Sequence, residues 1–195
     1  MICRTPLAPC ARRITLVLMD VDGVMTDGRL VLLGSDREAK AFDAKDGVGL
    51  WLARRAGLRT GLISGRGSAA VLQRANELGM DEIHLKTEDK LAAYRRILKR
   101  RGLIDTEVCY IGDDLVDLPI LARAGMSVAV ADAHPEVLRR TRFVTRSRGG
   151  RGAVREVIDA ILKAQGKWST VLGWFTERAG NQARSSRTAR RRPGQ

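Results

Sequence analysis

The amino-acid sequence predicts a doubly wound, Rossmann-like α/β domain: a parallel sheet with a β-hairpin inserted in place of a cap domain. Short apolar runs rich in Val, Ile and Leu alternate with amphipathic stretches of helical periodicity. Most of these runs are bounded by Gly or Asp, as buried parallel strands are. This alternation of β and α elements is typical of a parallel sheet with helices on both faces.

The individual elements follow from the same pattern. We expect strands at residues 14–19, 59–63, 82–85, 107–111, 127–130 and 142–144. We expect helices at residues 47–56, 68–78, 90–101, 115–124, 135–140 and 152–164. A left-handed C-cap favours glycine, and five glycines stand just past a helical pattern: Gly57, Gly79, Gly102, Gly125 and Gly166.

One segment interrupts the alternation and predicts the hairpin. Residues 29–33 and 37–42 have strand character on either side of a Gly-Ser-Asp turn, so residues 29–42 are expected to form a β-hairpin. Because this hairpin follows the first strand, it should lie above the carboxyl edge of the sheet, where doubly wound folds bind ligands.

The length of 195 residues suits one domain. We expect a leader at residues 1–13, the domain at 14–168 and a basic, disordered tail at 169–195, because Arg, Ser and Gly dominate the last part of the chain.

Three cysteines without a CxxC motif indicate neither a disulfide framework nor a zinc site, and favour the cytoplasm. The sequence shows neither a signal peptide nor a transmembrane helix, so we expect no membrane partner.

The net charge of +13 suits an anionic substrate, but it also suits loose binding of nucleic acid. The tail motivates an alternative function as a polyanion-binding protein, since six arginines and no acid follow Glu177. These arginines lack interleaved aromatic residues, and the acidic motifs described next would repel phosphate backbones. We therefore do not expect nucleic acid as the main partner.

Two carboxylates separated by one residue follow the first predicted strand. Asp20 and Asp22 should thus lie at the carboxyl edge of the sheet. Acids this close repel each other unless a cation lies between them, and Mg²⁺ suits a site that also receives phosphate. A loop of solvated, turn-forming acids explains this motif equally well when it is taken alone.

A second acidic group follows the strand at residues 107–111. Asp113, Asp114 and Asp117 open the helix that comes next. A helix cap would explain one acid, but not three. Acids at two strand ends of one sheet therefore favour a metal site lined by oxygen atoms.

Two further residues suggest an anion site. Ser64 ends the second predicted strand just before a helix, so its hydroxyl and the nearby backbone amides can bind a phosphate, although an ordinary N-cap is the alternative. Lys90 opposes the dipole of the helix that it opens, which a phosphate would offset. A solvated surface lysine is the alternative interpretation of Lys90.

The order of these four motifs resembles the haloacid dehalogenase superfamily. Over residues 14–168, longer segments resemble the 3-deoxy-D-manno-octulosonate 8-phosphate phosphatase family: DVDGVMTDGRL, DAKDGVGL, ISGRG, DKLAAY, YIGDDLVDLP, SVAVADAHPEV and RGGRGAVREVIDAILKAQGKW. The resemblance implies a Mg²⁺-dependent phosphatase that acts on a phosphorylated sugar acid in lipopolysaccharide sugar synthesis.

The resemblance also implies roles for individual residues. Asp20 would be the nucleophile that forms an aspartyl phosphate, and Asp22 the general acid and base. Mg²⁺ would be held by Asp20, the backbone carbonyl of Asp22, and Asp113. Ser64 and Lys90 would hold the phosphoryl oxygens, while Asp114 and Asp117 would orient Lys90 and the waters on the metal. The substrate-binding residues would be Asp43, Ala44, Lys45, Asp46, Gly47, Gly65, Arg66, Arg74 and Lys90.

Trp51 departs from the family pattern, in which an arginine is common at this position. This departure leaves open a substrate of another size, the 9-phosphate of a nine-carbon sugar acid. The hairpin is too small to be a lid, and the resemblance implies a homotetramer in which hairpins and neighbouring chains close the sites.

Overall fold

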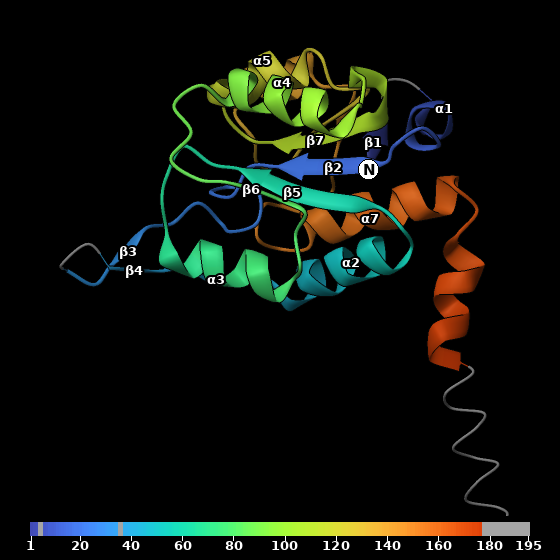
Figure 1. The fold of residues 1–195 in the computed structure, drawn as a ribbon, viewed down its shortest axis with the longest axis horizontal. Helices are drawn as coiled ribbons and strands as arrows, with labels where there is room; N and C mark the ends of the chain where they lie inside the picture. Colours follow the sequence, from blue (N-terminus) through green and yellow to red (C-terminus); the bar gives the residue numbers. More distant parts are fainter. Residues whose placement is uncertain (4–5, 35–36, 177–195) are drawn as a thin grey trace, which may run out of the picture.

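The computed structural model describes residues 1–3, 6–34 and 37–176 of the chain. Its centre is a seven-stranded sheet of order β1-β9-β8-β7-β2-β5-β6 (Figure 1). Six of these strands are parallel, and β1 pairs antiparallel with β9 at one edge. The bounds are β1 Ile2–Cys3, β2 Leu16–Met19, β5 Arg59–Ile63, β6 Glu82–His84, β7 Val108–Gly112, β8 Met126–Ala129 and β9 Phe143–Val144.

Helices cover both faces of the sheet, which confirms the predicted doubly wound fold. In Figure 1, α4 and α5 lie above the sheet, and α2, α3 and α7 lie below it. The bounds are α1 Leu7–Ala11, α2 Ala44–Arg55, α3 Ala69–Glu77, α4 Lys90–Arg101, α5 Leu118–Leu121, α6 Pro135–Arg140 and α7 Ala153–Ala164, with 3₁₀ turns η1 Asp105–Glu107 and η2 Leu115–Asp117.

Strand β2 is the centre of the sheet and sets the position of the site. All four of its residues are buried, as expected for a parallel strand between two helical layers. Met19, its last residue, is in register with Leu62 of β5 and Ile111 of β7. The segments that follow β2, β5 and β7 therefore start side by side at one edge of the sheet.

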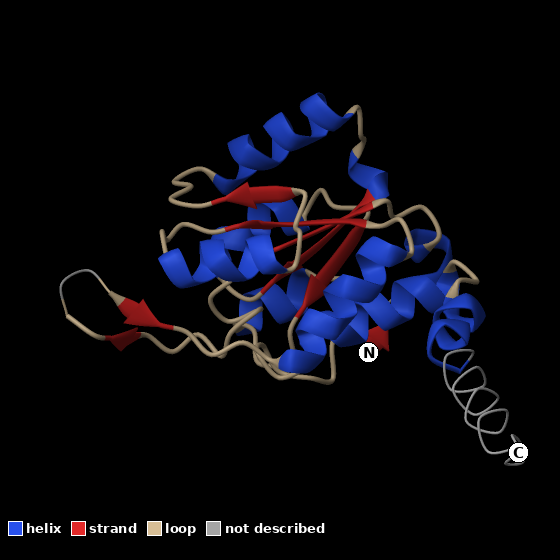
Figure 2. Ribbon diagram, turned by 60° about the horizontal axis from the view of Figure 1, so that its bottom comes forward, coloured by secondary structure: helices blue, strands red, loops and turns tan. Residues whose placement is uncertain are grey.

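The inserted hairpin consists of β3 Val31–Leu32 and β4 Glu38–Ala39, and it protrudes from the domain (Figure 2). Val31 pairs with Ala39 and Leu32 with Glu38, which confirms the predicted pairing. Two residues of the expected turn, Ser35 and Asp36, lie outside the described residues. The apolar side chains at positions 30–33 are exposed.

Four of the five predicted glycine caps have a positive φ, but Gly125 does not. A Cβ at Gly125 would lie 2.6 Å from the Cα of Thr106, so this glycine is needed for close backbone packing instead. The predicted helix at residues 115–124 is also interrupted: η2 precedes α5, which begins at Leu118 and has a proline in its first turn.

Both ends of the chain carry more structure than expected. Within the predicted leader, β1 extends the sheet and α1 packs against α7. Residues 168–176 are helical rather than a disordered tail, and Val171 is buried, which explains why this segment folds. The rest of the predicted tail, residues 177–195, lies outside the described residues. Among the described residues, no helix combines the length and apolar content needed to cross a bilayer.

Candidate functional site

A cleft of about 580 Å³ opens at the carboxyl ends of β2, β5 and β7. The parallel strands bring to one place the predicted residues that follow them, although these are far apart in the sequence. The predicted residues that line the cleft are Asp20, Asp22, Ser64, Gly65, Arg66, Lys90, Asp113 and Asp114.

Asp20 directly follows β2 and is 7% exposed. Its backbone N–H donates to the carbonyl of Ile111, which extends the β2–β7 pairing by one residue. Burial and the nearby charge of Asp117 together raise the pKa of Asp20 to about 6, against the opposing effect of Lys90. A buried carboxylate that is held in this way is poorly hydrated and is available to a ligand in the cleft.

Asp113 follows β7 and faces Asp20 across the cleft. Burial and the charges of Asp20 and Asp117 raise the pKa of Asp113 to about 8. Its Oδ1 atom is buried, and no described residue donates a hydrogen bond to it. A Cβ at Gly23 would lie 2.0 Å from Asp113 Oδ2, so the loop after β2 can pass this carboxylate only with glycine there.

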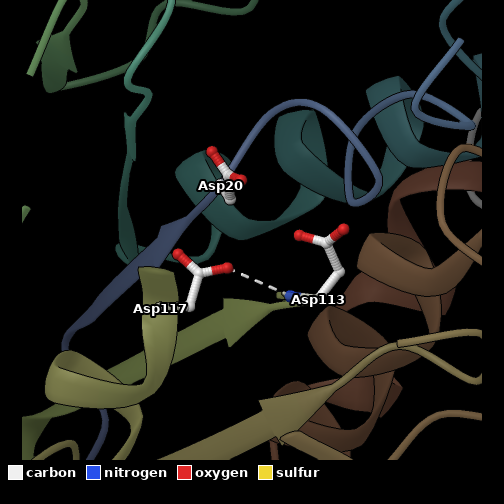
Figure 3. Close-up of side chains that lie close together, drawn as sticks. All are labelled: Asp20, Asp113 and Asp117. Atoms are coloured by element: carbon white, nitrogen blue, oxygen red, sulfur yellow. Dashed lines mark hydrogen bonds between the residues drawn. The ribbon is translucent and has the colours of Figure 1, made fainter. Parts of the chain in front are cut away.

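The carboxylates of Asp20, Asp113 and Asp117 converge, each with an oxygen within 4.8 Å of the others (Figure 3). A hard divalent cation fits this arrangement. The site offers oxygen ligands and brings like charges close together, and among the described residues one buried carboxylate oxygen has no hydrogen-bond donor. Asp20 and Asp113 are thus suited to hold Mg²⁺. The Asp22 carbonyl oxygen, to which no described residue donates a hydrogen bond, is a third candidate ligand.

Asp117 is close to these carboxylates, but its own oxygens are already used. Its Oδ1 accepts hydrogen bonds from the Tyr110 hydroxyl and the Lys90 ammonium, both at 2.8 Å. Its Oδ2 accepts from the backbone N–H groups of Asp113, at 3.1 Å, and Asp114, at 3.5 Å. Asp117 therefore fixes the backbone that carries Asp113 and is better placed to support a metal ligand than to be one.

Lys90, the first residue of α4, lies between two carboxylates. Its Nζ is 2.9 Å from Asp20 Oδ1 and 2.8 Å from Asp117 Oδ1. Burial alone would lower the pKa of Lys90, but the two carboxylates outweigh it and raise this pKa. The same carboxylates offset the unfavourable helix dipole, so Lys90 is not a solvated surface lysine.

Ser64 lies at the end of β5 and is buried. Its Oγ accepts a hydrogen bond of 3.2 Å from the backbone N–H of Arg66. Ser68, not Ser64, caps α3, with its Oγ 3.4 Å from the Val71 nitrogen. The ordinary N-cap interpretation of Ser64 is therefore wrong, and its hydroxyl can donate its hydrogen to a ligand in the cleft that it lines.

The turn at Gly149 and Gly150 packs against the loop that follows β2. The Gly150 N–H donates to the Val24 carbonyl at 2.9 Å, and a Cβ at Gly149 would lie 1.7 Å from the carbonyl oxygen of Gly23. Because only glycine permits this approach, the Gly149–Gly150 turn holds the loop that passes Asp113.

The hairpin contributes two charged residues that sequence reasoning missed, Glu38 and Lys40. Lys40 is 1% exposed at its side chain, and its Nζ lies 2.5 Å from Asp22 Oδ1 and 3.4 Å from Glu38 Oε1. Arg66 closes the ring, at 3.1 Å from Glu38 Oε2 and 3.7 Å from Asp22 Oδ2. The one signal in the sequence is the two-residue spacing of Glu38 and Lys40, which places both on the same side of an extended segment.

Six predicted substrate-binding residues do not line the cleft: Asp43, Ala44, Lys45, Asp46, Gly47 and Arg74. Asp43 is the N-cap of α2 and accepts a hydrogen bond from the Lys45 nitrogen at 2.6 Å. Asp46 is buried and faces α7 instead: its carboxylate accepts from the backbone nitrogens of Arg155, at 2.8 Å, and Gly152, at 3.2 Å. Asp46 thus caps the start of α7, directly after the Gly149–Gly150 turn.

Arg74 lies over the first turn of α2, where its guanidinium occupies the space that a side chain at Gly47 would need. Arg74 also pairs with Glu77 at 3.3 Å. Trp51, the residue that departs from the family pattern, packs against Trp174 and Phe175 of the C-terminal helical segment. Packing against this segment explains a tryptophan at position 51 without a substrate contact.

Comparisons with known proteins place the chain in a family. The family model of haloacid dehalogenase-like hydrolases matches residues 75–158. The chain is 44% identical over 163 residues to 3-deoxy-D-manno-octulosonate 8-phosphate phosphatase of Yersinia pestis, covering 84% of this chain and 87% of that protein. The corresponding enzyme of Escherichia coli K12 is 41% identical over the same shares.

Solved structures extend the similarity to the fold. The crystal structure of the Yersinia pestis phosphatase superposes with a TM-score of 0.81 and covers 83% of this chain and 87% of that one. The Moraxella catarrhalis phosphatase, solved in complex with a magnesium ion, a phosphate ion and a KDO molecule, has a TM-score of 0.84 at 37% identity. That comparison covers 87% of this chain and 97% of the other.

Proposed function

Because this chain belongs to the haloacid dehalogenase-like hydrolases and, within them, to the 3-deoxy-D-manno-octulosonate 8-phosphate phosphatase family, we propose that it converts 3-deoxy-D-manno-octulosonate 8-phosphate to the free sugar acid and phosphate. One observation carries the proposal. Asp20 and Asp113 come from different strands and converge in a cleft beside Lys90 and Ser64, which is the donor set that phosphoryl transfer to a carboxylate needs.

We propose that the reaction proceeds in two steps. An oxygen of Asp20 attacks phosphorus, the bond from phosphorus to the sugar oxygen breaks, and Asp22 gives a proton to the leaving oxygen. Water then attacks the phosphoryl group on Asp20, Asp22 accepts a proton from that water, and the bond from phosphorus to the Asp20 oxygen breaks. The proton that Asp22 takes from water replaces the one that it gave to the leaving oxygen, so Asp22 returns to its starting state after each turnover.

The charged residues around Asp20 prepare this chemistry. Lys90 and Ser64 would bind phosphoryl oxygens, and Asp117 keeps the Lys90 ammonium beside the reacting carboxylate. Asp20, Asp113 and the Asp22 carbonyl would hold Mg²⁺, which matches the magnesium ion named with the Moraxella relative. When bound, the ion offsets the repulsion between phosphate and carboxylates and stabilises the charge that develops on the phosphoryl group.

We further infer that the active form is a cytoplasmic homotetramer. The cleft is open to solvent, and the hairpin beside it exposes four consecutive apolar side chains, Leu30, Val31, Leu32 and Leu33. Such a surface suits burial against neighbouring chains, which would close the cleft and exclude water from the phosphoenzyme. Size-exclusion chromatography with light scattering on wild-type protein and a Leu32→Ser variant tests this assembly.

The decisive experiment compares turnover of eight-carbon and nine-carbon sugar acid phosphates, each with and without Mg²⁺. We expect phosphate release that requires Mg²⁺ and a higher kcat/KM for 3-deoxy-D-manno-octulosonate 8-phosphate. A clear preference for a nine-carbon 9-phosphate would reject the proposed substrate but retain the phosphatase. Mg²⁺-independent turnover, or none with any sugar acid phosphate, would reject the proposed function itself.

A further inference from the structure

All three tryptophans of the chain lie in one region, on α2 and the helical segment 168–176. The rings of Trp51 and Trp174 are 6.3 Å apart at an interplanar angle of 81°, and those of Trp51 and Phe175 are 6.1 Å apart. The Arg55 guanidinium lies over both tryptophans, 5.3 Å from the Trp51 ring and 4.6 Å from the Trp174 ring. These contacts fix the helical segment against α2.

The outer side of this packing is apolar and exposed. Val48, Trp51, Leu172 and Phe175 have exposed fractions between 42% and 53%. Val48 and Trp51 are three residues apart on one helix, and so are Leu172 and Phe175 on the other, so each pair shares a face. We call these four residues the aromatic patch. In Figure 1 the segment that carries Phe175 extends from the end of the molecule opposite to the hairpin.

The exposed charged residues on the two elements that carry the aromatic patch are all basic. Residues 168–176 contain no charged residue, and the one acid of α2, Asp46, is buried against α7. Lys45, Arg54 and Arg55 are the basic residues of α2. After the helical segment, the sequence 177–195 contains six arginines and one glutamate, and therefore carries a net charge of 6 − 1 = +5.

We propose that the aromatic patch docks on the surface of an anionic lipid bilayer, a partner that the basic residues of α2 and the net charge of residues 177–195 favour. Stable attachment to a membrane surface generally needs two signals, and an apolar face beside a polybasic segment supplies both. Tryptophan and phenylalanine suit this role because their rings reside in the interface between acyl chains and water. In this arrangement the docked helix lies in the plane of the interface, so the attachment is peripheral and requires no transmembrane helix.

Two other occupants of the patch fit the charges less well. A second copy of the chain would bring two segments of +5 charge together, which opposes association through this face. Single-stranded nucleic acid would require open aromatic faces for base stacking. The guanidinium of Arg55 already covers the Trp51 and Trp174 rings, so an apolar environment around the ring edges suits them better.

The experiment uses full-length protein and vesicles of two compositions, phosphatidylcholine alone and phosphatidylcholine mixed with phosphatidylglycerol. We expect flotation only with the anionic vesicles and a blue shift of tryptophan fluorescence. Bromine-labelled acyl chains should quench this emission, which reports on this region because all three tryptophans lie on α2 and residues 168–176. Replacing both Leu172 and Phe175 with Ser should weaken vesicle binding by about tenfold or more. Each substitution removes apolar surface that would be buried in the bilayer interface.

Ile104→Ser is the matched control, because Ile104 is 57% exposed, against 50% for Leu172 and 53% for Phe175, and it follows α4 on the opposite face of the sheet from α2. This variant should bind vesicles like wild type. A variant with the six arginines changed to Gln should lose the preference for anionic vesicles. Equal binding to both compositions, or no quenching, overturns the proposal. The proposal also fails if the Leu172→Ser, Phe175→Ser variant changes its oligomeric state but still binds vesicles like wild type. It fails as well if single-stranded RNA displaces the protein from the vesicles. The proposal is independent of the reaction, so none of these outcomes depends on phosphatase activity.

Discussion

Two lysines bridge pairs of carboxylates at the candidate site, one from the sheet and one from the hairpin. Lys90 joins Asp20 to Asp117, and Lys40 joins Asp22 to Glu38. On the sheet side, buried strands and the hydrogen bonds of Asp117 fix the carboxylates. On the hairpin side, ion pairs are the main link between the hairpin residues Lys40 and Glu38 and their partners Asp22 and Arg66.

This difference separates two functions of the site. The sheet side gathers the residues that would bind phosphorus and metal, and its geometry follows from strand register. The hairpin strands pair over only two residues each and expose their apolar side chains. The position of the hairpin over Asp22 therefore depends on Lys40, Glu38 and Arg66, and changes on this side should alter the acid–base step more than phosphate binding.

The largest expected effect is on the sheet side, at the nucleophile. Asp20→Asn should lower kcat by at least ~10³-fold, because an amide cannot form the aspartyl phosphate. Steady-state phosphate release measures it. The fold should survive: burial raises the pKa of Asp20 to about 6, so its charge does not stabilise the metal-free protein at neutral pH. Near-normal turnover by a folded Asp20→Asn protein would assign the nucleophile elsewhere.

Asp113→Asn should weaken Mg²⁺ binding by about 100-fold, since a charged oxygen ligand is lost. Calorimetric titration of metal-free protein measures this affinity. The same substitution should increase the free energy of unfolding of the metal-free protein. The folded-state pKa of Asp113, about 8, lies above its unfolded value, so ionisation destabilises the fold progressively from pH ~4 to pH ~8.

The Asp113→Asn protein cannot ionise at this position, so near pH 8 it should be more stable than metal-free wild type by at least about 1.4 kcal/mol, the free energy that corresponds to one pKa unit. The gap should narrow as the pH falls and vanish below about pH 4, where wild-type Asp113 becomes protonated in the unfolded state as well. Urea unfolding at several pH values checks the trend. A gap that is independent of pH would show that Asp113 is not under electrostatic pressure from Asp20 and Asp117.

On the hairpin side, Lys40→Gln should lower kcat by about tenfold, because Asp22 loses the cation that orients it for proton transfer. KM should change little, since Lys40 does not line the cleft. Lys40→Arg should restore part of kcat. Arg29→Gln is the matched control: Arg29 is a basic hairpin residue with an exposed side chain, and its ion pair is with Asp27. Equal losses in both variants would mean that hairpin charge, not contact with Asp22, matters.

The same contrast explains what the sequence could predict. Asp20, Ser64 and Asp113 each follow an apolar run, and parallel strands bring such positions together, so their proximity could be inferred. Glu38 lies in the two-residue strand β4 and Lys40 follows it, and their partners are 28 and 18 residues away in the sequence. The pairing of Trp51 with Trp174 and Phe175 joins residues more than a hundred positions apart, and no local pattern encodes it.

Asp46 gives the smallest expected effect and tests whether the start of α2 binds sugar or supports the fold. Its carboxylate accepts hydrogen bonds from Gly152 and Arg155, so Asp46→Ala should cost about 1–3 kcal/mol of unfolding free energy by leaving buried N–H groups unpaired. KM should stay nearly unchanged under conditions where the variant is folded. Asp159→Ala is the control on α7, where the surface pair with Arg155 should contribute less than about 1 kcal/mol. A large rise in KM for Asp46→Ala at wild-type stability would return this residue to the substrate site and place sugar at the Gly149–Gly150 turn.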